Sequence, residues 1–176
     1  MKKVKQAIII MIVCILGSSS FSAISSMNSL ANTLKKQFYE GSHGDNLSIY
    51  EDIIDEKGIA ENLVALANKY LTNDSNVKEL TDVTNKIGNE KSIKALYKLM
   101  TTMDTNVDEL ISKLKKVDLQ QQHQTMLEKY ESEYKSERTT ISTDPYNSMV
   151  RAYYDETSGL LGSFFRIFAN KPEYFE

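Results

Sequence analysis

Apolar residues recur in steps of three and four along most of the chain, which is the spacing of one helix face. The pattern is clearest near the C-terminus, where Asp144 and Pro145 supply a start signal. A carboxylate can accept the free amides of a first turn, and the fixed φ of proline suits the first helical position. This predicts one helix over residues 146–170, ended by Pro172. Its apolar face consists of Tyr146, Val150, Tyr153, Leu160, Phe164 and Ile167.

Other amphipathic patterns precede this helix. Residues 27–38 form a short one, which ends at the glycine-containing residues 41–45, and residues 49–71 form a second. Residues 77–117 form a third, with a kink or short break at Gly88 and Asn89 and a capping box from Asn76 and Glu79 at its start. Residues 119–141 carry the narrowest apolar stripe, so we expect the most exposed helix there. The prediction is an all-α fold, an antiparallel bundle of about four long helices preceded by an N-terminal hydrophobic segment.

The N-terminus has the composition of an export signal. Lys2, Lys3 and Lys5 precede the apolar residues 7–16, and a serine-rich stretch follows through Ser26. Ten apolar positions are typical of a cleaved signal peptide, with cleavage before Ala23, whereas extension through Ile24 gives eighteen residues and a membrane anchor. Both alternatives stay open. We interpret residues 1–25 as a signal-anchor or signal peptide and residues 26–176 as one helical domain.

The lysine cluster also predicts the orientation. Positive charge before the apolar run keeps the N-terminus in the cytoplasm and places the domain outside the cell membrane. The expected location is therefore a single-pass protein of the cell membrane with an extracytoplasmic domain. The alternative is a freely secreted helical bundle.

Composition narrows the function classes. The chain has 176 residues with 41% hydrophobic and 26% charged residues but only two prolines, which is typical of a folded helical protein. Its net charge is −3, and −6 without the three N-terminal lysines, which disfavours a nucleic-acid partner. The single Cys14 permits no intrachain disulfide and no cysteine metal site. Because Val13 is larger than the residue that lipid attachment requires there, we interpret Cys14 as a small hydrophobe.

No pattern of catalytic residues is present. His43 and His123 are eighty positions apart, and we expect both to be solvent-exposed and non-catalytic. No Glu-x-x-His spacing of a bundle metal site occurs, nor does a nucleophile elbow, a phosphate loop or a dinucleotide fingerprint. We therefore predict no enzyme, no catalytic or metal-binding residues, no cofactor and no small-molecule substrate. The acidic pairs fall between apolar positions and predict a solvated helix face: Glu51-Asp52, Asp55-Glu56 and Asp108-Glu109.

An aromatic cluster near the C-terminus allows two interpretations. The aromatic side chains could close one end of the bundle core. Alternatively, they could contact lipid or a protein partner, because they exceed what one terminal turn easily buries. The cluster consists of Phe164, Phe165, Phe168, Tyr174 and Phe175.

Residues 146–154, YNSMVRAYY, resemble the YN-x-x-V-x-x-YN run of the LemA family, and the closing residues 171–176, KPEYFE, are similar to its aromatic-Phe-Glu ending. Weaker similarities are Glu137, Asn62-Leu63-Val64 and Asp118-Leu119. The second YN reads Tyr153-Tyr154 here, and Leu161 stands where the family usually has proline, so the chain resembles a divergent member. The residues that match the family motif are Tyr146, Asn147, Val150, Tyr153, Tyr174, Phe175 and Glu176.

The resemblance implies an antiparallel helical bundle held at the membrane by one N-terminal segment. The predicted function is a protein-interaction or scaffold role at the cell envelope, with an unknown protein partner and an undefined molecular activity. A freely secreted bundle and an enzyme with an unrecognised site are the alternatives.

Overall fold

The computed structural model describes the backbone of residues 2–41 and 48–176, and the side chains of residues 11, 17–41 and 48–176. All regular structure in these ranges is helical, which confirms the predicted all-α class. The chain divides into two compact units that are described separately. The bundle unit consists of Gln37–Asn147 and Glu173–Glu176, and the terminal unit consists of Met1–Lys36 and Ser148–Pro172.

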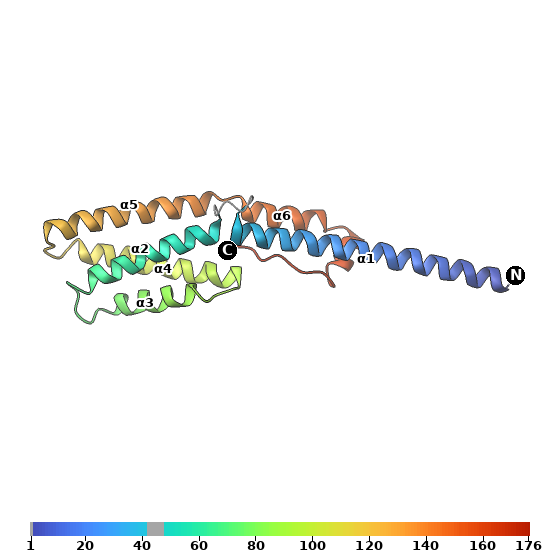
Figure 1. Ribbon diagram of the computed structural model, residues 1–176, viewed down its shortest axis with the longest axis horizontal. Helices are drawn as coiled ribbons and strands as arrows, with labels where there is room; N and C mark the ends of the chain where they lie inside the picture. Colours follow the sequence, from blue (N-terminus) through green and yellow to red (C-terminus); the bar gives the residue numbers. More distant parts are fainter. Residues whose placement is uncertain (1, 42–47) are drawn as a thin grey trace. The chain divides into compact units, whose positions relative to one another are not determined.

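Four helices make up most of the bundle unit (Figure 1). The colours of Figure 1 show that successive helices run in opposite directions, which confirms an antiparallel bundle. Helix α2 packs against the other three, and α3 packs against α4. The most deeply buried positions include Ile53, Leu63, Leu80, Ile87, Leu96, Met103, Leu110 and Leu114. The helices are α2 Ile49–Ala67, α3 Ser75–Ile87, α4 Ile93–Leu114 and α5 Gln121–Thr143.

Polar residues fix where three of these helices begin. Ser48 accepts a hydrogen bond from the backbone N of Glu51 at 3.2 Å, and Ser92 accepts one from Ala95 at 3.3 Å. Asp74 caps α3 through the backbone N of Asn76 at 2.8 Å. The predicted capping box is therefore wrong: Asn76 lies inside α3, and its side chain binds Glu109 and Lys113.

Of the kink or short break predicted at Gly88 and Asn89 within residues 77–117, the structure shows the break, since α3 ends at Ile87 and α4 begins at Ile93. The polar residues between them form a tight connection, in which the Glu90 carboxylate accepts hydrogen bonds from the backbone N atoms of Lys91 and Ser92, both at 2.8 Å. With Ser92 as the N-cap of α4, a new helix begins in place of a kink. Helix α5 buries only Leu127, Tyr134 and Ile141, the fewest of α2–α5, as the narrow stripe predicted.

The terminal unit contains most of α1 Lys2–Glu40 and α6 Tyr146–Glu156, and all of α7 Leu160–Phe165. Helix α1 ends at Glu40, and Gly41 follows with a left-handed φ of 77°, so the helix ends where the predicted break at residues 41–45 begins. Among the described residues, no helix is both long and apolar enough to cross a membrane. Side chains of residues 7–10 and 12–16, Cys14 included, lie outside the description, so the predicted export signal or anchor stays a prediction.

The helix predicted over residues 146–170 begins at Tyr146 as expected, with the Asp144 carboxylate accepting from the backbone N of Tyr146 at 2.8 Å. It ends at Glu156, however, and α7 follows separately. Thr157 Oγ1 binds the C=O of Tyr153 at 2.8 Å, and Ser158 Oγ binds the C=O of Asp155 at 2.7 Å. These side chains satisfy the last carbonyl groups of α6, so the chain can leave the helix before Gly159.

Candidate functional site

The closing residues 173–176 are held in the bundle unit by hydrogen bonds. Tyr146 Oη donates to the C=O of Glu173 at 2.8 Å. The Asn147 carboxamide donates to the C=O of Phe175 at 2.9 Å and accepts from its backbone N at 2.8 Å, so it satisfies both backbone groups of one residue. We call this arrangement the C-terminal clasp, made by Tyr146 and Asn147 on residues 173–175.

Glu173 and Phe175 connect the clasp to the helices. The Glu173 carboxylate accepts from Ser92 Oγ at 2.7 Å and from the backbone N of Lys94 at 3.0 Å. A carboxylate at a helix N-terminus satisfies free amides and interacts favourably with the helix dipole. The buried ring of Phe175 lies 5.4 Å from that of Phe38 and 5.2 Å from that of Tyr97. The clasp thus closes the aromatic end of the bundle core.

A pocket of about 350 Å³ lies beside the clasp in the bundle unit. One part of its wall is apolar, and another part carries three carboxylate residues and one guanidinium. Asp104, Asp144 and Glu176 supply the acidic groups, whereas Arg138 is the only basic residue among the described residues of the lining. The remaining lining residues are Ile49, Tyr97, Met100, Ile141, Ser142, Tyr146, Asn147 and Phe175.

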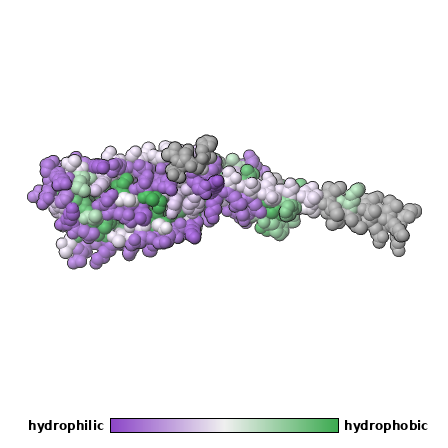
Figure 2. Space-filling model, in the orientation of Figure 1, coloured by the Kyte–Doolittle hydropathy of each residue, from purple (hydrophilic) through white to green (hydrophobic). Residues whose placement is uncertain are grey.

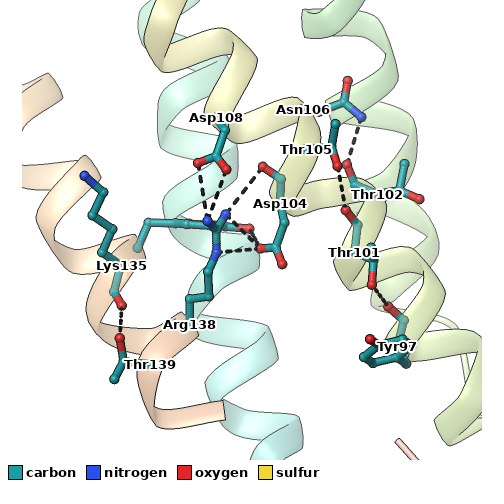
Figure 3. A network of polar contacts seen from close by, with 11 residues as sticks. Tyr97, Thr101, Thr102, Asp104, Thr105, Asn106, Asp108, Lys135, Arg138 and Thr139 are labelled. Carbon is teal, nitrogen blue, oxygen red and sulfur yellow. Dashed lines mark hydrogen bonds and ion pairs between the residues drawn. The ribbon is translucent and has the colours of Figure 1, made fainter. Parts of the chain in front are cut away.

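Arg138 on α5 is the centre of the polar network behind this pocket (Figure 3). Its Nε and Nη2 lie 3.1 Å and 3.0 Å from Asp104 Oδ1, and its Nη1 lies 3.1 Å from Asp108 Oδ2. Tyr134 Oη donates to the same Asp104 oxygen at 2.9 Å, and the guanidinium carbon lies 5.0 Å from the Tyr134 ring centre. One arginine therefore joins α5 to two turns of α4.

Burial and charge act in opposite directions on the pKa values of this network. Burial raises the pKa of Asp104 above its usual value, although the Arg138 charge and the Tyr134 hydrogen bond lower it. Burial also works against the charged Arg138, but the hydrogen bond and charge of Asp108 and the charge of Asp104 raise the pKa of Arg138. Tyr134 has a raised pKa, chiefly from burial, and so remains a hydrogen-bond donor.

Glu56 on α2 is fully buried near this network. Neither of its carboxyl oxygens has a hydrogen-bond partner among the described residues. Burial, together with the negative charge of Asp104, raises the pKa of Glu56 to about 8, although Arg138 opposes the shift. The carboxyl is consequently protonated at neutral pH. Burial and the charge of Glu137 likewise raise the pKa of the neighbouring Asp52 to about 6.

The structure brings together four of the seven motif residues, since Tyr146, Asn147, Phe175 and Glu176 line the pocket. Val150 and Tyr153 are instead buried in the terminal unit, where Tyr153 Oη donates to the C=O of Asn170 at 3.0 Å. Tyr174 is half-buried next to the clasp.

The aromatic cluster divides between the two units, and the second interpretation, contact with lipid or a partner, stays a prediction. Phe175 is buried in the bundle core, as the first interpretation requires. Phe164 and Phe168 of the terminal unit are exposed, as the second requires.

Sequence reasoning missed Glu56, Asp104 and Arg138. The expectation of a solvated face for the Asp55-Glu56 pair is wrong for Glu56, which is 0% exposed. The burial of Glu56 could have been predicted from the helical spacing, because Glu56 lies three residues after Ile53 and four before Ala60, both of which are buried. Asp108 and Glu109 are exposed as expected, although both have partners.

His123, the one histidine that the structure describes, does not line the pocket. His123 is half-buried rather than exposed, because its ring packs edge-on to Tyr70 and its Nδ1 lies 2.5 Å from Tyr70 Oη. His43 lies outside the described residues. Within the described part of the chain, no group of three or more His, Cys, Asp or Glu side chains is arranged to hold a metal ion.

Comparison of the chain with protein-family models, with curated proteins and with solved structures found no match. The resemblance to the LemA family therefore stays a prediction.

Proposed function

We propose that this chain is a membrane-tethered helical bundle that acts through protein contacts at the outer face of the cell membrane, as the LemA resemblance implies. We further propose that the pocket beside the clasp receives a partner segment with basic and apolar side chains. The observation that carries the proposal is the chemistry of this pocket. Its acidic residues outnumber its single arginine, and that arginine already binds Asp104 and Asp108.

Two further features support a basic partner. The bundle unit contains 22 acidic and 13 basic residues, a net charge of −9, which attracts positively charged segments over some distance. Tyr97, Met100 and Phe175 supply the apolar wall on which the stem of a lysine or arginine, or an apolar neighbour, can pack. The tether is supported by the apolar residues 7–16 behind three lysines.

Site-specific photocrosslinking in intact cells tests the pocket. A photoreactive phenylalanine analogue replaces either Tyr97, which lines the pocket, or Tyr130, which lies on α5 outside it. We expect a crosslinked partner from position 97 only. Ser142→Trp should abolish this crosslink because Ser142 is an exposed pocket residue, whereas Ser136→Trp, another exposed serine of α5, should leave it intact.

Identical crosslinks from positions 97 and 130 would show that the pocket is not where the partner binds. A crosslink from position 97 that persists in the Ser142→Trp variant would show the same. N-terminal sequencing of membrane and medium fractions tests the tether separately. An intact Met1 in the membrane fraction is expected. A mature chain in the medium that begins near Ala23 would favour the secreted alternative.

The pocket also leaves a physical basis for the enzyme alternative, because it holds a carboxyl of raised pKa, Asp104, beside a guanidinium. No substrate-binding feature beyond these groups favours that alternative.

A further inference from the structure

The exposed apolar surface of this protein lies in one unit. All described large apolar side chains that stand exposed belong to the terminal unit. Figure 2 shows apolar colour gathered over the part of that unit where the chain passes through α7. We call the exposed residues of α7 and the turn after it the α7 patch, and each of them is between 54% and 90% exposed: Leu160, Leu161, Phe164, Ile167 and Phe168.

The segment that carries this patch is held firmly in place by its polar groups. Arg166 Nη1 donates to the C=O of Tyr154 and to Thr157 Oγ1, both at 3.3 Å, and its guanidinium lies 5.3 Å from the Tyr154 ring centre. Ser163 Oγ donates to the C=O of Ser158 at 2.9 Å. The polar side chains of this segment thus form hydrogen bonds within the terminal unit, while the apolar side chains of the α7 patch face outward. An arrangement of this kind marks a contact surface.

The position of the patch along α1 indicates what covers it. Asn28 Oδ1 on α1 accepts a hydrogen bond from the backbone N of Asn170 at 2.7 Å, which fixes the end of the α7 segment to that level of α1. Helix α1 is continuous from Lys2 to Glu40. Asn28 lies four residues beyond Ile24, the last residue of the predicted membrane span, or about 6 Å along the helix axis. The headgroup layer extends roughly 5–8 Å beyond the hydrocarbon on each side.

The charge of the terminal unit points the same way. Apart from Lys2, Lys3 and Lys5, which the proposed tether places on the cytoplasmic side, it contains five basic and two acidic residues, a net charge of +3, against −9 for the bundle unit. Lys171 lies three residues after the end of the patch, and Arg151 lies on α6 in the same unit. Apolar side chains accompanied by basic ones are the composition of segments that lie in the interface of anionic membranes.

We propose that the α7 patch is a lipid-contact surface that lies in the headgroup layer of an anionic membrane, beside the point where α1 leaves the hydrocarbon. The inference rests on the proposed tether for its placement. The protein would then have a second membrane contact besides the tether. In this contact the aromatic side chains of Phe164 and Phe168 pack against lipid.

The chain contains no tryptophan, so a single substitution creates a unique fluorescent probe. The full-length Phe164→Trp protein is reconstituted into vesicles of phosphatidylcholine and phosphatidylglycerol with brominated acyl chains. We expect a blue-shifted emission and at least about a twofold loss of intensity relative to vesicles without bromine, because bromine quenches only nearby indoles. Tyr130→Trp in the bundle unit is the matched control, and its emission should stay unquenched.

Adding Leu160→Ser and Leu161→Ser to the Phe164→Trp protein should reduce the quenching, with helical circular dichroism as the check on folding. Unquenched Phe164→Trp emission overturns the inference. If that emission is instead protected from a soluble quencher in a concentration-dependent way, the patch is an interface between two copies, which also overturns it.

Flotation of the same vesicles measures whether the protein is attached to the membrane, and this measurement does not depend on the α7 patch. If the protein floats with the vesicles but its Phe164→Trp emission is unquenched, the lipid contact is refuted while the proposed function still stands. If the brominated vesicles quench the Phe164→Trp emission but N-terminal sequencing shows that the N-terminus is removed in cells, the lipid contact is supported and the tether is refuted.

Discussion

The bundle unit and the terminal unit differ in how far their large apolar side chains are exposed to solvent. Leu63 on α2 is 0% exposed, whereas Leu161 on α7 is 69% exposed. The bundle unit is acidic and even buries a carboxyl group, Glu56, among its apolar side chains. The terminal unit is basic and, although it buries Val150 and Tyr153, it carries all the exposed large apolar side chains among the described residues. One unit is thus organised around its own core, and the other around a surface.

This difference shows that helical periodicity and burial are separate properties. Leu160, Phe164 and Ile167 continue the spacing set by Val150 and Tyr153, yet only the earlier residues are buried. Spacing identifies a face that avoids water, but the partner that covers the face comes from the rest of the fold or from another molecule. Matched substitutions in the two units can break or sharpen the contrast.

The largest effect is expected from truncation of a leucine in each unit. Leu63→Ala should lower the free energy of unfolding by about 2–5 kcal/mol, because it removes buried methyl groups and leaves a cavity. Leu161→Ala should change it by less than about 0.5 kcal/mol, because the side chain is already in solvent. Chemical denaturation followed by helical circular dichroism measures both. Equal losses would mean that the α7 patch is buried within the protein in solution.

The buried carboxyl of Glu56 should make stability depend on pH. Its pKa is raised from 4.5 to about 8 in the folded protein, by burial first and by the facing charges of Asp104, Glu137 and Asp52 against Arg138. Above pH 4.5 the unfolded chain releases a proton that the folded chain keeps. The stability present at low pH is therefore lost as the pH rises toward 8, by roughly 2–3 kcal/mol between pH 5 and pH 7.

Glu56→Gln tests this expectation because glutamine has a similar shape and does not titrate. The variant should lose less stability than the unsubstituted protein over the same pH range and should be the more stable of the two at pH 8. Tyr134 and Asp52 also titrate abnormally near this site but remain in both proteins, so the difference between the two curves isolates Glu56. Parallel curves would show that Glu56 is ionised in the folded state.

Much of the fold was predictable from local pattern. The apolar stripes located α2 and α5, and Asp144 with Pro145 marked the start of α6. The break between α3 and α4 matches the short break predicted near Gly88 and Asn89, whereas the break after α6 was missed, and the two breaks have a common cause. Serine, threonine and glutamate side chains near residues 90–92 and 157–158 satisfy backbone groups, and such local bonds compete with the helix without disturbing the apolar spacing.

The candidate site was predictable only in part. The YN run and the closing YFE residues were singled out together as resembling one family, but no contact between them was predicted, and in the structure Asn147 binds Phe175. Asp104 and Arg138 are 34 residues apart on different helices, and nothing in the local sequence pairs them. Their meeting depends on the angular positions of α4 and α5 in the bundle, which is a property of the packed helices.

A smaller effect is expected from the ion pairs of α5. Arg138→Met should destabilise the bundle unit by about 1–2 kcal/mol, because it leaves the half-buried Asp104 without its cation. Lys135→Met is the control on the same helix. Its side chain is 65% exposed in an i, i+4 pair with Glu131, so its loss should cost less than about 0.5 kcal/mol.

Thermal unfolding of both variants by circular dichroism provides the measurement. Arg138→Met should also raise the pKa of Asp104, since the guanidinium charge lowers it in the unsubstituted protein, and carboxyl NMR titration can follow this shift. Equal losses for the two variants would place Arg138 among ordinary surface residues.

The smallest effects, of opposite sign, are expected from two glycine-to-alanine substitutions, one in each unit. A Cβ at Gly162 would lie 2.7 Å from the backbone oxygen of Thr157 and 3.0 Å from its carbonyl carbon, so α7 has to move away from the end of α6. A Cβ at Gly58 would meet nothing within 4 Å. Because Gly58 lies inside α2, alanine there should stabilise the bundle unit by about 0.5–1 kcal/mol through its higher helix propensity.

Hydrogen exchange resolves where each glycine substitution acts. Gly162→Ala should speed exchange only in residues 157–170, because the strain is confined to the contact between α7 and Thr157, and the bundle helices should be unaffected. Gly58→Ala should slow exchange in α2 and its neighbours and leave residues 157–170 unchanged. If Gly162→Ala instead speeds exchange across α2 to α5, the α7 segment contributes to the core of the bundle. The contrast between a unit organised around its core and a unit organised around its surface would then fail.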